Sequence, residues 1–255
     1  MKLTVVGCSG SYPGPDSPAS CYLLEHEGAR LVLDLGNGAF GALQRYCDPY
    51  EVDAVVLSHL HADHCLDMCS YYVARRYRPT GPAPRIPVLG PAGTAARLSR
   101  AYDLDPEPGM TEEFDFGEVH DGWSGQLGPF TVTTAQVRHP VDAYAIRVSA
   151  GGSTLVYSGD TGPCDELESL AAGADLALFE ASFVESAENP GDLHMTGRDA
   201  ARIAARAGVP RLMLTHLVPW NDPAEVAADA AEIHGVEVIL ASPGLTVDMA
   251  SSVTV

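Results

Sequence analysis

Three histidines and an aspartate stand within the six consecutive positions His59 to His64. The apolar end Val55-Val56-Leu57 of the preceding stretch predicts a buried strand. Imidazole nitrogen and carboxylate oxygen are the ligands that borderline cations such as zinc prefer, and packing them this densely without a cation would cost stability. The run therefore predicts a metal site on a loop, Ser58–His64, with a helix opening at Cys65. The alternative is a histidine-rich surface loop.

The same run can supply two metals. Alternation along an extended loop places His59 and His61 on one side, whereas Asp63 and His64 turn toward the predicted helix. Further partners stand after predicted strands or in a loop, where sites are usually built. These are His139, Asp160, His194 and His216. Taken singly, each such histidine is more often an ordinary loop residue, but their joint occurrence at strand ends favours one shared site.

Charge restricts the partners. The formal net charge is −19, and Lys2 is the only lysine. Extended nucleic-acid contact is disfavoured because a basic surface usually drives it. A small phosphate ester is still compatible, since two Zn²⁺ ions would add four positive charges where it binds.

The sequence has no stretch apolar enough to span a membrane and no signal peptide at Met1–Gly7, so we expect a cytoplasmic protein without a membrane partner. Cys65 and Cys69 are expected to be reduced core residues.

Hydrophobic patterning predicts an α/β fold with two similar β-rich halves in a single domain, 1–255. Expected strands are Leu3–Val6, Cys21–Leu24, Leu31–Leu33, Val55–Leu57, Phe130–Ala135, Ala143–Val148, Thr154–Tyr157, Leu176–Phe179, Leu212–Leu214 and Val236–Leu240. Expected helices are Phe40–Tyr46, Leu66–Tyr77, Ala95–Tyr102, Asp165–Ala171, Arg198–Ala207 and Ala224–His234. Asp103–Asp121 reads as the one long irregular stretch, and it is strongly acidic.

These elements resemble the metallo-β-lactamase superfamily, whose pattern is a His-x-His-x-Asp-His run followed by a single His, a Gly-Asp and a late single His. The resemblance implies an αββα sandwich, two mixed sheets packed face to face with helices outside. It implies two divalent metal ions, zinc first, with manganese and iron as alternatives. The implied ligands are His59, His61 and His139 for one metal, Asp63, His64 and His216 for the other, and Asp160 as a bridge. Asp34 matches the family aspartate that supports the ligands.

Within the superfamily, the chain is similar to the ribonuclease Z branch. The similarity lies in Phe179–Phe183, His194–Thr196 and Leu214–His216, with Ser182 and Met195 departing from the usual residues. It implies that His194 is a proton donor or phosphate clamp, that Glu180 orients it, and that a hydroxide shared by the metals attacks the phosphodiester. The implied catalytic residues are Asp63, Glu180 and His194.

Transfer-RNA substrates are reached in that branch by a protruding basic arm, which this sequence lacks. The match through Gly7–Ser11, Pro15–Ser20 and Ser58–Asp67 resembles a bacterial group of cyclic AMP phosphodiesterases. The resemblance thus implies hydrolysis of 3′,5′-cyclic AMP to 5′-AMP by a homodimer, with a ribonuclease Z-type transfer-RNA 3′-endonuclease as the alternative. Cyclic GMP or another small phosphodiester stays open.

Substrate-binding candidates are Arg75, Arg76, Trp220 and Thr196. The two arginines belong to a basic aromatic cluster whose alternative is a solvated helix face, and Trp220 is either a base-stacking residue or a packed loop anchor. A di-iron redox enzyme is disfavoured by Ala62, where such proteins usually carry Glu. A lactonase leaves Glu180 and His194 without a role. A non-catalytic module is the remaining class, and it is disfavoured by the complete ligand set.

Overall fold

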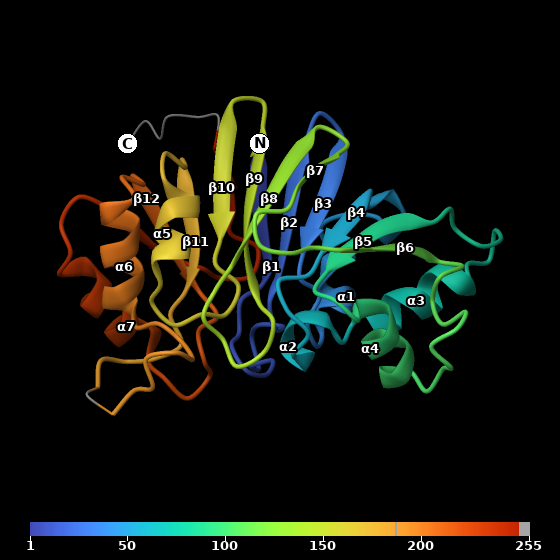
Figure 1. Cartoon of the computed structure of the whole chain (residues 1–255), viewed down its shortest axis with the longest axis horizontal. Coiled ribbons are helices and arrows are strands. Elements are labelled where there is room, and N and C mark those ends of the chain that lie inside the picture. The colour runs from blue at the N-terminus through green and yellow to red at the C-terminus, as the bar shows by residue number, and fades with distance from the viewer. Residues whose placement is uncertain (187, 250–255) are drawn as a thin grey trace.

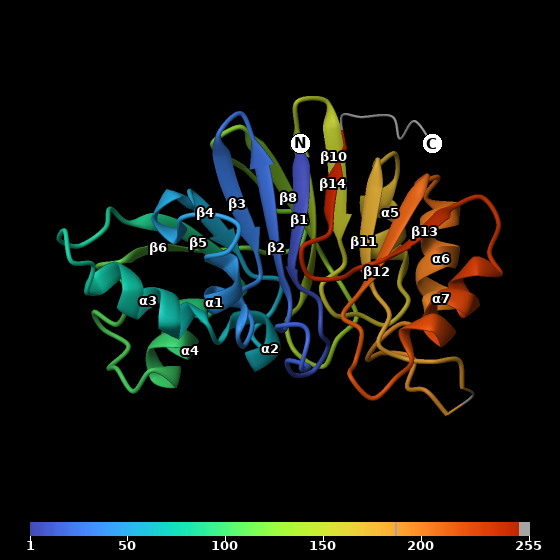
Figure 2. The same ribbon diagram turned by 180° about the vertical axis from the view of Figure 1, so that it is seen from behind.

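The computed structural model describes residues 1–186 and 188–249, so residues 187 and 250–255 of the expected 1–255 domain lie outside the described residues. Two seven-stranded sheets pack face to face, and helices cover the outer face of each (Figures 1 and 2). This arrangement confirms the expected αββα sandwich.

The first sheet is mixed. Its order is β14 (Thr246–Asp248), β1 (Lys2–Gly7), β2 (Cys21–His26), β3 (Ala29–Leu33), β4 (Ala54–Val56), β5 (Ile86–Gly90) and β6 (Phe114–Glu118). Strands β3 to β6 run parallel, and the other pairs are antiparallel. The outer face carries α1 (Ala39–Leu43), α2 (Ala62–Cys65), α3 (Met68–Arg76) and α4 (Thr94–Ala101), and a 3₁₀ turn covers Pro49–Glu51.

The second sheet repeats this pattern. Its order is β13 (Glu237–Leu240), β12 (Arg211–Thr215), β11 (Leu176–Glu180), β10 (Ser153–Tyr157), β9 (Tyr144–Ala150), β8 (Phe130–Gln136) and β7 (Ser124–Leu127). Strands β10 to β13 are parallel, and β7 to β10 are antiparallel. Its helices are α5 (Asp165–Ala171), α6 (Gly197–Arg206) and α7 (Pro223–Ala231).

Successive apolar residues along each strand point in turn to the inner core and to the outer helices. On β3, Leu31 and Leu33 face the core between the sheets, whereas Val32 faces the helices. On β10, Leu155 faces the inner core and Val156 faces α5 to α7. Because successive side chains of a strand point to opposite faces, continuous apolar runs cover both faces of each sheet.

Two tyrosines cross the inner core in opposite directions. Tyr22 of the first sheet shares a 2.6 Å hydrogen bond with Thr215 of the second. Tyr157 of the second sheet donates a 2.7 Å hydrogen bond to Asp34, which follows β3 of the first. The two rings pack at 5.0 Å between centroids, and both side chains are fully buried.

Some sequence expectations were wrong. Asp103–Asp121 is not irregular throughout, because Phe114–Glu118 forms β6 and places Phe114 in the core beneath α3. The helix expected to open at Cys65 begins at Ala62, so Asp63 and His64 lie on α2. The short strands β5, β7 and β14 were not foreseen.

The six cysteines are free. Cys65 is buried and Cys69 half-buried, both against the outer face of the first sheet, as expected for reduced core residues. None of the helices in the described part of the chain is long and apolar enough to cross a membrane.

Candidate metal centre

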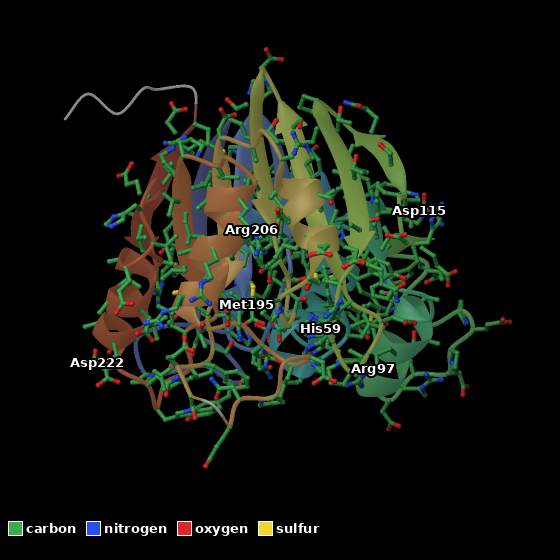
Figure 3. All side chains as sticks on the ribbon, turned by 60° about the vertical axis from the view of Figure 1, so that its left-hand side comes forward. His59, Arg97, Asp115, Met195, Arg206 and Asp222 are labelled. Atoms are coloured by element: carbon green, nitrogen blue, oxygen red, sulfur yellow. The ribbon has the colours of Figure 1, made fainter. Side chains whose placement is uncertain are left out.

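The polar residues singled out from the sequence meet at one edge of the sandwich. His59 and His61 follow β4, His139 follows β8, and Asp160 and His216 follow the parallel strands β10 and β12. Since parallel strands end at the same edge, their loops converge there. Helix α2, which carries the rest of the run, lies at the lower edge of the sandwich in Figure 1, and His59 is labelled there in Figure 3.

The first ligand group consists of His59, His61, His139 and Asp160, which come from three loops. Their ligand atoms lie within 4.8 Å of one another. Nδ1 of His61 is 3.0 Å from Nε2 of His59 and 3.2 Å from Nε2 of His139. Oδ2 of Asp160 is 3.6 Å from Nε2 of His59.

The second ligand group consists of Asp63, His64, Asp160 and His216, and it is buried. Nε2 of His64 lies 3.2 Å from Nε2 of His216 and 3.2 Å from Oδ1 of Asp160. Oδ2 of Asp63 is 3.1 Å from Nε2 of His216. Asp160 thus offers one oxygen to each group, which is the geometry of a bridging carboxylate.

Hydrogen bonds on the far side fix the tautomers of two histidines directly. Nδ1 of His139 donates to the carbonyl oxygen of Leu193 at 3.1 Å, and Nδ1 of His64 donates to Oδ2 of Asp34 at 2.8 Å. A carbonyl and a carboxylate can only accept, so the proton of each neutral ring is on Nδ1. Nε2 of each ring therefore faces the cluster. Burial alone would lower the pKa of His64, but the carboxylates of Asp160 and Asp34 raise it, so a cation bound at Nε2 would replace a proton there.

Two hydroxyl groups do the same for His59 and His216. Ser58 donates to Asp34 and accepts from Nδ1 of His59, and Ser182 donates to Glu180 and accepts from Nδ1 of His216. The distances are 3.1 Å at His59 and 2.7 Å at His216. Partners of this kind orient metal-binding histidines and fix which nitrogen binds.

Asp34 is the hub of this support. It is fully buried and accepts four hydrogen bonds, from the amide and hydroxyl of Ser58, the hydroxyl of Tyr157 and the ring of His64. Its backbone has a φ of 56°, a left-handed conformation that a non-glycine residue adopts at some energetic cost. The chain thus turns sharply after β3 to place this carboxylate beneath the ligands.

The donor set fits a divalent cation. Burial lowers the pKa of His59, His61 and His139, so these rings are in the neutral form that binds metal. Oδ1 of Asp160 is buried without a hydrogen-bond partner among the described residues, and ring nitrogens face one another at 3.0–3.2 Å. A cation bound here would supply the missing attraction, because imidazole and carboxylate are suitable ligands for such ions.

A buried acid and a histidine lie against the second group. Nδ1 of His194 donates to Oε1 of Glu180 at 2.8 Å, and the other Glu180 oxygen accepts from Ser182. Burial alone would lower the pKa of His194, but the charge and hydrogen bond of Glu180 raise it to about 9. His194 therefore carries a proton at neutral pH, and its ring lies 5.5 Å from that of His216.

Four expected substrate-binding residues are not brought into this cluster. Arg75 is 1% exposed, and its guanidinium bonds to Tyr71 and to the carbonyl of Pro84. The guanidinium of Arg76 pairs with Glu112 and Glu113. The hydroxyl of Thr196 caps α6 in a capping box with Asp199. Trp220 is 65% exposed, and its ring packs on that of Tyr12 at 5.6 Å.

Sequence reasoning missed the residues that hold the ligands in place. These are Ser58, Tyr157 and Ser182, together with the carbonyl of Leu193. Ser58 and Ser182 sit beside residues that were singled out, so adjacency was a usable signal. Tyr157 ends an apolar strand, and nothing in its local pattern distinguishes it from a core residue.

The Beta-lactamase superfamily domain model matches residues 29–217, which include all the ligands. The chain belongs to this superfamily. An uncharacterized protein of Mycobacterium leprae is 47% identical over 92% of this chain and 84% of its own length. The probable metallo-hydrolase YhfI of Bacillus subtilis is 30% identical over 96% of this chain and 98% of its own.

The crystal structure of YhfI superposes with a TM-score of 0.86, at 27% identity over 96% of this chain and 98% of that one. A ribonuclease Z of Mycobacterium bovis is 28% identical over 88% of this chain and 89% of its own length. The superfamily member described here thus lies in the ribonuclease Z-like branch. Its two ligand groups and this membership assign it to the metal-dependent hydrolases.

Proposed function

We propose that this superfamily member is a dinuclear metal phosphodiesterase that hydrolyses a small cyclic nucleotide to the 5′-monophosphate. The leading candidate substrate is 3′,5′-cyclic AMP. The observation that carries the proposal is the placement of the Glu180–His194 pair beside two ligand groups joined by Asp160. A metal ion in each group, zinc first, would supply positive charge and activate a water molecule.

The protein's own residues supply the remaining chemistry. Glu180 fixes the His194 ring through Nδ1 and leaves Nε2 as the nitrogen that can donate to substrate. Negative charge develops on the phosphoryl and leaving oxygens as the ester is attacked, and a positioned, protonated imidazole stabilises it. His194 is then suited to donate its Nε2 proton to the departing 3′-oxygen of the ribose.

Charge supports a small substrate over an extended one. The chain has a net charge of −19 and a single lysine, so the surface beyond the metal site repels a long polyanion. Few basic side chains are present there to release counterions and so favour binding. A cyclic nucleotide carries one phosphate, which would lie where the bound metals add positive charge. The second candidate is a transfer-RNA 3′-processing endonuclease, which the similarity to a ribonuclease Z favours.

The deciding experiment offers both substrates to one preparation of known metal content. Wild type and His64→Ala are incubated with cyclic AMP, with bis(4-nitrophenyl) phosphate and with a precursor transfer RNA at physiological salt. We expect cyclic AMP to be converted to 5′-AMP, with no cleavage by His64→Ala. Cleavage of the aryl ester with intact cyclic AMP would contradict the cyclic nucleotide assignment, and correct cutting of the RNA would establish the second candidate.

A further inference from the structure

Arg97 is a half-buried cation that the fold leaves unpaired. It lies on α4, and within residues 1–186 and 188–249 its guanidinium has no hydrogen bond, ion pair or ring contact. Other partly buried arginines, such as Arg76 and Arg198, pair with carboxylates. In a chain with 34 acidic residues and 15 basic ones, a partly desolvated guanidinium without a partner is unusual, because its charge favours a counter-group. Its donors are available to a ligand.

Arg97 lines a pocket that adjoins the first ligand group. The pocket has a volume of about 360 Å³, within the usual range of roughly 300–1,000 Å³ for small-molecule sites. His61 lines it, and Nδ1 of the same ring faces the cluster. Figure 3 labels Arg97 and His59 in the same lower part of the molecule. A ligand held at the metals can therefore extend into this space, which we call the Arg97 pocket.

The lining of the Arg97 pocket suits a neutral ring with both donors and acceptors. Asp142 lines it together with Arg97, yet no ion pair joins the two side chains. A second phosphate would be repelled by the Asp142 carboxylate. Apolar side chains cover the remaining walls, and Val141 among them is 40% exposed, which is high for a large hydrophobic residue.

We propose that the Arg97 pocket binds the nucleobase of the substrate. A purine presents a ring-nitrogen acceptor next to an exocyclic group, so Arg97 donates to the ring nitrogen and Asp142 accepts from the amino group. The ring faces pack against Val141 and the other apolar side chains. This inference rests on the proposed function and names the residues that would distinguish a purine cyclic nucleotide from a simple phosphodiester.

The test compares a substrate that has a purine with one that has none. The variants are Arg97→Gln and Asp142→Ala, and the matched control is Arg100→Gln, an exposed arginine on the same helix that does not line the pocket. For each, kcat/KM is measured with cyclic AMP and with bis(4-nitrophenyl) phosphate. Adenosine, which has no phosphate, is used as a competitive inhibitor of aryl ester hydrolysis, and its binding is measured by equilibrium dialysis.

We expect Arg97→Gln to lower the ratio of kcat/KM for cyclic AMP to that for the aryl ester by about tenfold or more, as for the loss of one hydrogen bond from a charged donor. Adenosine binding should weaken by a similar factor, and Arg100→Gln should match wild type. Equal losses for both substrates would overturn the assignment and place Arg97 at the phosphate. If wild type leaves cyclic AMP intact, the proposed function fails. The nucleobase pocket then stands or falls by adenosine, and it fails if adenosine does not bind or binds Arg97→Gln equally well.

Discussion

Replacing Asp34 with asparagine tests whether the buried carboxylate sets the metal affinity. Asp34 accepts hydrogen bonds of 2.7, 2.7, 2.7 and 2.8 Å, three of them at Oδ2 and one, from the Ser58 amide, at Oδ1. In its best orientation, asparagine keeps its oxygen at the Oδ2 position and turns its amino group against the Ser58 amide. One buried amide then loses its acceptor, at a cost of about 1–3 kcal/mol.

The same substitution removes the charge that His64 feels through Nδ1. Loss of such a partner typically lowers metal affinity about 10- to 100-fold. Tyr157→Phe is the matched comparison, because it removes one donor to Asp34 and leaves the carboxylate facing His64. Its cost in unfolding free energy should be about 1 kcal/mol, and its metal affinity should fall less than about threefold.

Both quantities are measured on the same samples. Competition with a chromophoric chelator gives the zinc affinity, and guanidinium unfolding in excess chelator gives the stability without metal. The reasoning would be refuted if Asp34→Asn bound zinc as tightly as wild type, or if Tyr157→Phe weakened zinc binding by the same factor.

Three further predictions concern the site and its support. In Gly36→Ala the new Cβ would lie 1.9 Å from the carbonyl oxygen of Asp63. We therefore expect the free energy of unfolding, measured with heat or denaturant, to fall by about 2 kcal/mol and zinc binding to weaken. Gly41→Ala, with open space around its Cβ, should be neutral or slightly stabilising. Glu180→Gln should lower kcat on bis(4-nitrophenyl) phosphate about 100-fold while metal per chain, measured by mass spectrometry, is unchanged; joint loss of metal would show that Glu180 acts through His216. Protein held at a free zinc concentration 100 times the dissociation constant of one site should lose about 2.7 kcal/mol of unfolding free energy when a chelator removes the metal. An unchanged melting temperature would argue against metal binding by the native state.

The positions of His59, Asp160 and His216 were predictable because each follows an apolar strand. A strand that must fill the core on both faces leaves its polar residues at the end, and the ends of β4, β10 and β12 lie at one edge. Local sequence therefore indicated which residues would meet. It could not indicate how they meet, because the 3.0–3.2 Å spacings depend on the packing of one sheet on the other.

Helix orientation explains why Arg75 is buried. Met68, Tyr71, Tyr72 and Arg75 are the buried residues of α3, at the i, i+3, i+4 and i+7 spacing of one helix face. That period was legible in the sequence and would have placed Arg75 on the buried stripe. It is tolerated there because its guanidinium bonds to Tyr71 and the Pro84 carbonyl.

Strand β6 was hidden for a different reason. Its alternating phenylalanines, Phe114 and Phe116, lie in a strongly acidic stretch, which reads as a solvated loop. The strand forms because β5 offers it a parallel edge, with Ile86 opposite Phe114. Such a partner 28 positions earlier in the chain is not a local signal.

The crossing tyrosines, Tyr22 and Tyr157, fix the alignment of the two sheets. Each hydroxyl reaches a partner on the opposite sheet, so sliding one sheet by a single residue, about 3.3 Å, would break both hydrogen bonds at once in a dry core. Apolar contacts between sheets tolerate such a slip far better, because they are not directional. The pair therefore fixes the register between the sheets, and with it the 3.2 Å distance between Nε2 of His64, on α2 beside the first sheet, and Nε2 of His216, which follows β12 of the second.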